Sequence, residues 1–191
     1  MPAILTLTMN PAVDLSTTTD VVVPTEKLRC SSPALDPGGG GINVARVVTR
    51  LRGTAHAIYP RGGPTGDLLD RLVAGEGISI RPVPVEGMTR YSFTVDERKS
   101  GDQFRFVLPG PALREREWRA VLDQIGGPER EGALLVLSGS LPPGVPDDFH
   151  ARVAGIARER GFRIVLDSSG PALQQAVAAG VWLIKPNREE F

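Results

Sequence analysis

The chain has 191 residues, and its 22 Lys and Arg balance its 22 Asp and Glu, so the formal net charge is zero. The lack of a basic excess argues against nucleic acid as a partner, because such binding depends on releasing phosphate counterions. Cys30 is the only cysteine, which excludes an intramolecular disulfide and a cysteine-based zinc site. His56 and His150 have no partner at metal-ligand spacing, and we expect both at the surface or at the edge of the core.

The N-terminal apolar run is of strand length, lacks the basic start of a signal peptide, and no segment reaches the roughly 18 apolar residues of a membrane span. We therefore expect a cytoplasmic chain with no membrane partner.

Short apolar runs alternate with helical stretches, the pattern of an α/β domain built on a parallel sheet, and we expect one domain over residues 1–191. The expected core strands are Ile4–Met9, Ala55–Tyr59, Leu134–Ser138, Arg163–Asp167 and Val181–Ile184. The expected helices are Ile42–Leu51, Thr65–Ala74, Arg114–Ile125, Asp147–Arg160 and Ala172–Ala178.

Two segments, 13–36 and 89–108, are extended and contain no helix. We interpret them as antiparallel hairpins that stand off the main sheet as a lid or a dimer clasp, with ordinary edge hairpins as the alternative. At the other end, residues 181–184 predict a strand and residues 186–191 the start of a helix. Since a domain seldom ends on an unfinished βα unit, we interpret the sequence as truncated, with the C-terminal part of the fold missing.

Four consecutive glycines, Gly38–Gly41, lead directly into the helix expected from Ile42. Glycine adopts positive φ and lets a ligand approach the backbone, and a helix N-terminus presents unpaired N–H groups and a positive dipole end. The run therefore favours an oxygen-rich or anionic small molecule, with a flexible turn as the alternative. The sequence contains neither a P-loop nor a complete G-x-G-x-x-G motif, so a dinucleotide-binding oxidoreductase is disfavoured.

Polar residues follow several of the expected strands, and ligands of open α/β sheets bind beyond the carboxyl ends of the strands. These residues are Asn10, Ser138–Gly144, Asp167–Gly170 and Lys185–Asn187. Asn187 with Glu190 fits either a helix cap or a carboxylate that helps to hold hydrated Mg²⁺ beside nucleotide phosphates. Lys27 and Arg29 share one face of an extended segment, which suits a phosphorylated substrate or a solvated strand face.

Taken together, these motifs resemble the PfkB branch of the ribokinase-like carbohydrate kinases. The resemblance covers essentially the whole chain and rests on Thr6–Asp14, Lys27–Cys30, Pro37–Arg46, Met88–Arg90, Ser138–Gly144, Asp167–Gly170 and Lys185–Glu190. Within this branch the unbroken glycine run and the Lys27–Cys30 segment are most similar to PfkB-type 6-phosphofructokinases. Related 1-phosphofructokinases and tagatose-6-phosphate kinases tend to carry lysine where this chain has Gly40, and they stay as alternatives.

The resemblance implies a ribokinase-like parallel sheet flanked by helices, a small antiparallel β lid, and transfer of the ATP γ-phosphate to the 1-hydroxyl of fructose 6-phosphate. It places Asp14, Gly39, Asn43 and Ser140 at the sugar. It also implies that Arg90 binds the sugar phosphate with help from Lys27 and Arg29, one of them contributed across a homodimer joined through the lid. For ATP and Mg²⁺ it implies Lys185 and Asn187 on the nucleotide side, and Glu190 and Asp167 near the metal.

One part of the family pattern is missing from the sequence. The Gly-Ala-Gly-Asp motif, which supplies the catalytic base in this family, does not occur, and we expect it beyond Phe191. Asp67 lies in a look-alike segment that matches another part of the family, so we assign no catalytic residue. The chain is then expected to be inactive alone, either as the front portion of a kinase or as a non-catalytic sugar-phosphate-binding fragment.

Overall fold

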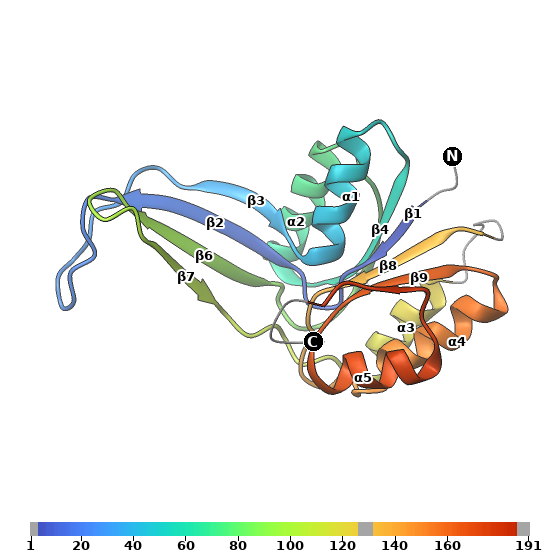
Figure 1. Cartoon of the computed structure of the whole chain (residues 1–191). Coiled ribbons are helices and arrows are strands. Elements are labelled where there is room, and N and C mark those ends of the chain that lie inside the picture. The colour runs from blue at the N-terminus through green and yellow to red at the C-terminus, as the bar shows by residue number, and fades with distance from the viewer. Residues whose placement is uncertain (1–3, 126–131, 187–191) are drawn as a thin grey trace.

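The main body is a parallel sheet covered on both faces by helices, as seen in a computed structural model that describes residues 4–125 and 132–186 (Figure 1). Its strand order is β10-β9-β8-β1-β4-β5, and every recorded pair is parallel. The strands are β1 (Ile4–Leu7), β4 (Ala55–Arg61), β5 (Ser79–Pro84), β8 (Leu134–Ser138), β9 (Arg163–Asp167) and β10 (Leu183–Ile184). The predicted α/β class and the parallel sheet are confirmed.

The five helices divide between the two faces of the sheet (Figure 1). They are α1 (Gly40–Arg50), α2 (Gly63–Gly75), α3 (Glu115–Ile125), α4 (Phe149–Glu159) and α5 (Gly170–Ala179). Ile42 of α1 and Leu69 of α2 share a core cluster with residues of β4 on one face of the sheet. Trp118 of α3 and Phe149 of α4 share a second cluster with Leu5 of β1 on the other face. Each face therefore has its own core, because neighbouring residues of a strand point to opposite sides.

A second sheet of four strands projects from this body as a lid (Figure 1). Its strands are β2 (Ala12–Thr19), β3 (Ala34–Gly38), β6 (Arg90–Glu97) and β7 (Gln103–Val107), in the order β3-β2-β6-β7. The pairs β2–β3 and β6–β7 are antiparallel as predicted, but β2 and β6 pair in parallel, so the lid sheet is mixed rather than antiparallel. Both strands leave the body at the same place, where Ala12 lies opposite Arg90, and must run in the same direction.

One strand of the main sheet was not predicted, and one histidine lies where it was not expected. Strand β5 was not expected, because it contains Pro82 and Pro84, and proline is rare inside strands. Both prolines are tolerated there because β5 is the edge strand of the sheet. His150 is 2 % exposed on the inner side of α4, beside Phe149, and does not lie at the surface. The predicted helices all form, with ends shifted by one or two residues. Among the described residues, no helix combines the length and the apolar character needed to cross a membrane.

Candidate functional site

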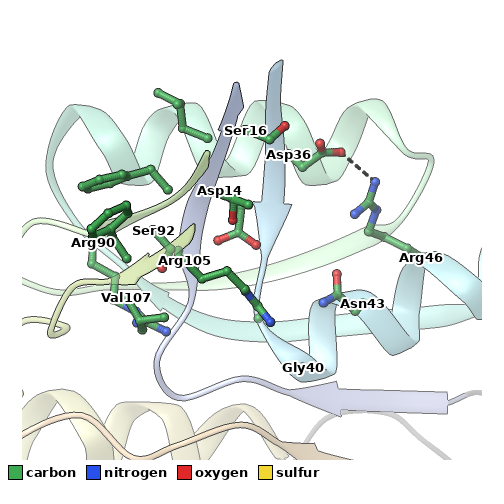
Figure 2. A pocket seen from close by; sticks show the side chains of 16 residues that line it. Asp14, Ser16, Asp36, Gly40, Asn43, Arg46, Arg90, Ser92, Arg105 and Val107 are labelled. Atoms are coloured by element: carbon green, nitrogen blue, oxygen red, sulfur yellow. Dashed lines mark hydrogen bonds and ion pairs between the residues drawn. The ribbon is translucent and has the colours of Figure 1, made fainter. Parts of the chain in front are cut away.

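A cavity of about 570 Å³ lies where the lid meets the first turn of α1. The lid contributes Asp14 from β2, Asp36 from β3, Arg90 and Ser92 from β6, and Arg105 from β7. The residues of the body are Gly39, Gly40, Asn43 and Arg46. Figure 2 shows the Asp14 carboxylate, the Arg105 guanidinium and the Asn43 amide directed toward one another across the space in front of Gly40.

The register of the lid strands explains why these polar groups share one face. Asp14 lies opposite Asp36 on one side and Ser92 on the other, and Ser92 lies opposite Val107. Arg105 lies one step further along, in the row of Ser16 and Thr94, so it falls on the same face of the pleated sheet. The intervening residues, Leu35, Leu15, Phe93 and Phe106, form an apolar row on the opposite face.

The glycine run is a tightly packed junction rather than a flexible turn. A Cβ atom at any of the four positions would come closer than 3.0 Å to another group: the Asp14 carboxylate at Gly38, Thr8 at Gly39 and Gly41, and Ser138 at Gly40. Gly39, the helix N-cap, also has φ of 128°, which side chains rarely adopt. The Ile42 N–H donates to Thr8 Oγ1 at 3.0 Å. The glycines thus let the first turn of α1 approach the ends of β1 and β8 closely.

Arg90 and Arg105 bring positive charge to the lining, whereas the third guanidinium, that of Arg46, is paired with Asp36 and Glu76. Arg90 donates to the Leu108 carbonyl at 2.8 Å and to the Asn10 carbonyl at 3.0 Å, while its buried Nε has no hydrogen-bond partner among the described residues. Burial lowers the pKa of Arg90 and raises that of Asp14, against the opposing effect of Arg90 and Arg105 on Asp14. An anion that accepts a hydrogen bond from Arg90 would stabilise its charge in this partly buried position.

A second hollow, of about 410 Å³, adjoins the first. Gly40 and Asn43 border both, and Ser138 and Asp167 complete the polar part of the second. Asp167 accepts a hydrogen bond from Ser138 Oγ at 3.2 Å and forms an ion pair with Lys185 Nζ at 3.3 Å. The first turn of α1 therefore borders both hollows, a geometry suited to bringing two ligands together at its N–H groups.

The structure brings four of the predicted site residues, Asp14, Gly39, Asn43 and Arg90, to the first cavity. Ser140 does not line this cavity; its hydroxyl accepts a hydrogen bond at 3.1 Å from Nδ2 of Asn10, whose carbonyl accepts one from Arg90.

Lys27 and Arg29 do not line the cavity; they lie in the long connection between β2 and β3 at the outer end of the lid (Figure 1). Lys185 and Asp167 meet at the sheet edge as described, whereas Asn187 and Glu190 lie outside the described residues.

Sequence reasoning missed Arg105, Arg46 and Asp36. Arg105 sits between two phenylalanines in an alternating strand, so the sequence does show that it points away from them. Arg46 is three residues after Asn43 and so shares a helix face with it. Neither pattern identifies the cavity, because that depends on which distant strands pair with one another.

A hydrated magnesium ion requires one or two carboxylates in addition to phosphate oxygens. Of the two predicted metal residues, Asp167 offers oxygen ligands at the edge of the second hollow, and it is engaged with Lys185 and Ser138. The described residues contain no group of three His, Cys, Asp or Glu side chains that could hold a metal ion by themselves. Asp167 alone offers one carboxylate, which suits a metal that is held mainly by phosphate oxygens and water.

Residues 7–191 match the pfkB family of carbohydrate kinases. The chain belongs to that family. It is 50% identical over 190 residues to the ATP-dependent 6-phosphofructokinase isozyme 2 of Mycobacterium tuberculosis, and 46% identical over 192 residues to the isozyme 2 of Escherichia coli. These matches cover all of this chain but only 56% and 62% of the relatives' own length.

The comparison with solved structures agrees with this family assignment. The E. coli phosphofructokinase-2 in complex with fructose-6-phosphate superimposes with a TM-score of 0.95 at 45% identity, covering 100% of this chain and 63% of that one. A D-tagatose-1-phosphate kinase of Bacillus licheniformis is a more distant relative, 34% identical over 191 residues, and this chain covers 60% of it.

Proposed function

We propose that this chain forms the sugar-phosphate site of an ATP-dependent kinase that converts fructose 6-phosphate to fructose 1,6-bisphosphate. The observation that carries the proposal is the first cavity, where Arg90 and Arg105 provide the positive charge and Asp14 and Asn43 provide groups for sugar hydroxyls. Guanidinium groups suit a phosphate, and carboxylate and amide groups suit hydroxyls. The relatives named 6-phosphofructokinase support the choice of sugar.

In this proposal the sugar lies along the first turn of α1. Asp14, Asn43 and the backbone at Gly39 orient the hydroxyls, with Ser140 nearby through its bond to Asn10, while Arg90 and Arg105 hold the phosphate. Lys185, which pairs with Asp167 beside the second hollow, would neutralise nucleotide phosphates, and Asp167 would hold hydrated Mg²⁺. Bound Mg²⁺ would shield the charge of the transferred phosphoryl group, and the N–H groups of α1 stabilise charge that develops between the hollows.

Gly40 bears on the choice between sugar phosphates. A side chain at this position would meet Ser138 Oγ, which occupies the space beside it. A lysine there, as in the 1-phosphofructokinase and tagatose-6-phosphate kinase pattern, would require Ser138 to move. This packing favours the 6-phosphofructokinase assignment over those two alternatives.

The outer face of the lid supports the proposed homodimer. Leu35 is 40% exposed and Phe106 is 45% exposed, and Phe106 stacks on Phe93 at a ring distance of 4.9 Å. An exposed apolar row of this kind is typical of an interface. Two lids that pack through it would bring Lys27 or Arg29 of the partner subunit, neither of which lines the cavity of its own chain, toward the cavity.

Calorimetric titration of the chain with fructose 6-phosphate and with fructose tests the proposal. We expect the phosphorylated sugar to bind at least about tenfold more tightly, because Arg90 and Arg105 contact only the phosphate. Arg90→Ala should remove most of this difference. Arg98→Ala, which removes the same charge from the far end of the lid where Arg98 pairs with Asp20, should not. Equal affinity for both sugars, or an Arg90→Ala chain that binds like the wild type, would refute the proposal.

Turnover provides a second test. The chain contains no Gly-Ala-Gly-Asp segment, so we expect no ADP production that depends on fructose 6-phosphate. A clear Mg²⁺-dependent rate would show that another residue serves as the base. Binding of NAD(H) in place of sugar phosphate would instead support the oxidoreductase alternative.

A further inference from the structure

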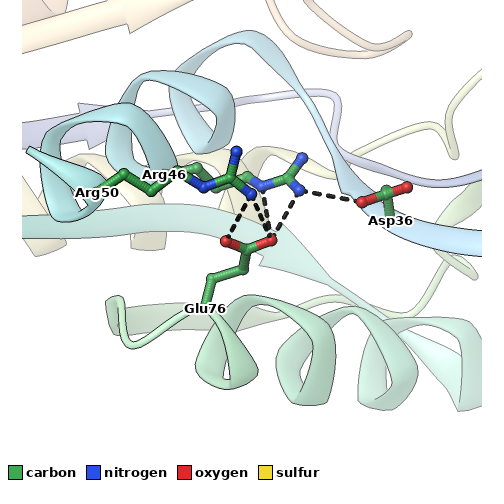
Figure 3. A network of polar contacts seen from close by, with 4 residues as sticks. All are labelled: Asp36, Arg46, Arg50 and Glu76. Carbon is green, nitrogen blue, oxygen red and sulfur yellow. Dashed lines mark hydrogen bonds and ion pairs between the residues drawn. The ribbon is translucent and has the colours of Figure 1, made fainter.

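Arg46 lies at the wall of the first cavity and directs its guanidinium toward two carboxylates, that of Asp36 in the same wall and that of Glu76 (Figure 3). Its Nη2 donates to Asp36 Oδ1 of β3 at 3.0 Å and to Glu76 Oε1 at 2.7 Å, and its Nε donates to the same Glu76 oxygen at 3.1 Å. Glu76 is the C-cap residue of α2. Arg46 of α1 is therefore bonded both to the helical body and to a strand of the lid.

The place of Asp36 gives this contact its consequence. Asp36 lies directly opposite Asp14 in the β2–β3 pair, on the same face of the lid. Like charges in opposed positions of a sheet repel each other, and the negative charge of Asp36 also opposes an anionic ligand in the cavity. Arg46 forms an ion pair with Asp36 and so offsets the negative charge that would otherwise repel Asp14 and an anionic ligand.

Glu76 keeps Arg46 in this orientation. Arg46 and Arg50 are four residues apart on α1, where two like charges would repel, and Glu76 accepts hydrogen bonds from both. These bonds, those from Arg46 first, hold the pKa of Glu76 below its usual range. The Arg46 side chain is 17% exposed, so its guanidinium is enclosed by the carboxylates rather than free to turn to a ligand.

We propose that Arg46 is a positioning residue of the sugar-phosphate site, which neutralises Asp36 and ties lid strand β3 to α1 so that Asp14 alone presents a free carboxylate to the ligand. The inference deepens the proposed function and rests on it. It assigns Arg46 no contact with the phosphate, which distinguishes it from Arg90 and Arg105 in the same cavity.

A double-mutant cycle separates this role from direct binding. Arg46→Met should weaken binding of fructose 6-phosphate about tenfold, because Asp36 is left unpaired beside the ligand. Asp36→Asn in the Arg46→Met chain should restore the affinity to within about threefold of the wild type. If Arg46 instead bound the phosphate of the sugar directly, Asp36→Asn would not restore the affinity. Arg50→Met is the matched control, because Arg50 shares Glu76 but touches neither Asp36 nor the cavity, and it should bind like the wild type.

The titration of Asp14, followed by NMR, gives a readout that needs no ligand. The charged groups that act on Asp14 are Arg90 of β6, Arg105 of β7, Asp36 of β3 and Arg46 of α1. Arg46→Met should raise the pKa of Asp14, and the added Asp36→Asn should lower it again. If Arg46→Met does not fold, Asp36→Asn alone should lower that pKa.

An affinity loss that Asp36→Asn does not rescue would overturn the proposal, and so would an Asp14 pKa that is indifferent to both substitutions. A wild-type chain that does not bind fructose 6-phosphate would refute the proposed function, while the Asp14 titration would still decide the role of Arg46.

Discussion

His150 makes the stability of this chain depend on pH in a way that one substitution should remove. Its ring is 2% exposed, and neither ring nitrogen has a hydrogen-bond partner among the described residues. Burial lowers the pKa of His150 from 6.5 to about 4, because the imidazolium cannot be solvated beside Phe149. Between these values the unfolded chain binds a proton that the folded chain does not, so stability is full above pH 6.5 and is lost as the pH falls toward 4.

The size of the effect follows from the two pKa values. From about pH 7 to about pH 5 the unfolded histidine becomes almost fully protonated, and linkage predicts a loss of about 2 kcal/mol from this one residue. Urea unfolding at both pH values measures the loss. His150→Leu, which is of similar size and does not titrate, should reduce the pH dependence by that amount. His56→Asn, at a half-buried position of β4, serves as the control. Equal pH dependence in the wild type and His150→Leu would refute the reasoning.

Three further substitutions test the packing of the glycine run and the charge of the cavity. Gly41→Ala places a Cβ 2.7 Å from Thr8 Oγ1 and 2.8 Å from the Leu7 carbonyl, so it should cost about 1–3 kcal/mol in urea unfolding. Gly155→Ala, in α4 with nothing within 4 Å, should instead stabilise by about 0.5–1 kcal/mol. Arg105→Met should weaken fructose 6-phosphate about tenfold or more and leave fructose unchanged, whereas equal losses for both sugars would exclude a phosphate contact.

The main sheet could be predicted from sequence because each strand carries its own local signal. Leu134–Ser138 and Arg163–Asp167 formed with the predicted bounds, since each is a continuous apolar or alternating run that ends at turn residues. The lid could be predicted only in part. Its hairpins are local, but the parallel pairing of Ala12 with Arg90 joins segments almost eighty residues apart, and no local pattern encodes it. The burial of His150, in contrast, could have been predicted from a local pattern, because Phe149, Val153 and Ala157 mark the buried face of α4 beside it.

The same distinction explains which site residues were found. Asp14, Asn43 and Arg90 lie in motifs that resemble a known family, so they could be assigned before the cavity was seen. Arg46 and Asp36 required the lid register, which sets Asp36 opposite Asp14 and within reach of α1.

The four glycines lie between the site residues that were predicted, such as Asp14 and Asn43, and those that were missed, Asp36 and Arg46. A Cβ at Gly38 would meet the Asp14 carboxylate and one at Gly40 would meet Ser138 Oγ, so β3 lies tightly against β2 and α1 lies tightly against the end of β8, with Gly39 alone joining β3 to α1. That closeness allows a helix side chain to control the charge of a lid strand. A larger residue in the run would therefore disturb the Arg46–Asp36 contact as well as the backbone that faces the ligand.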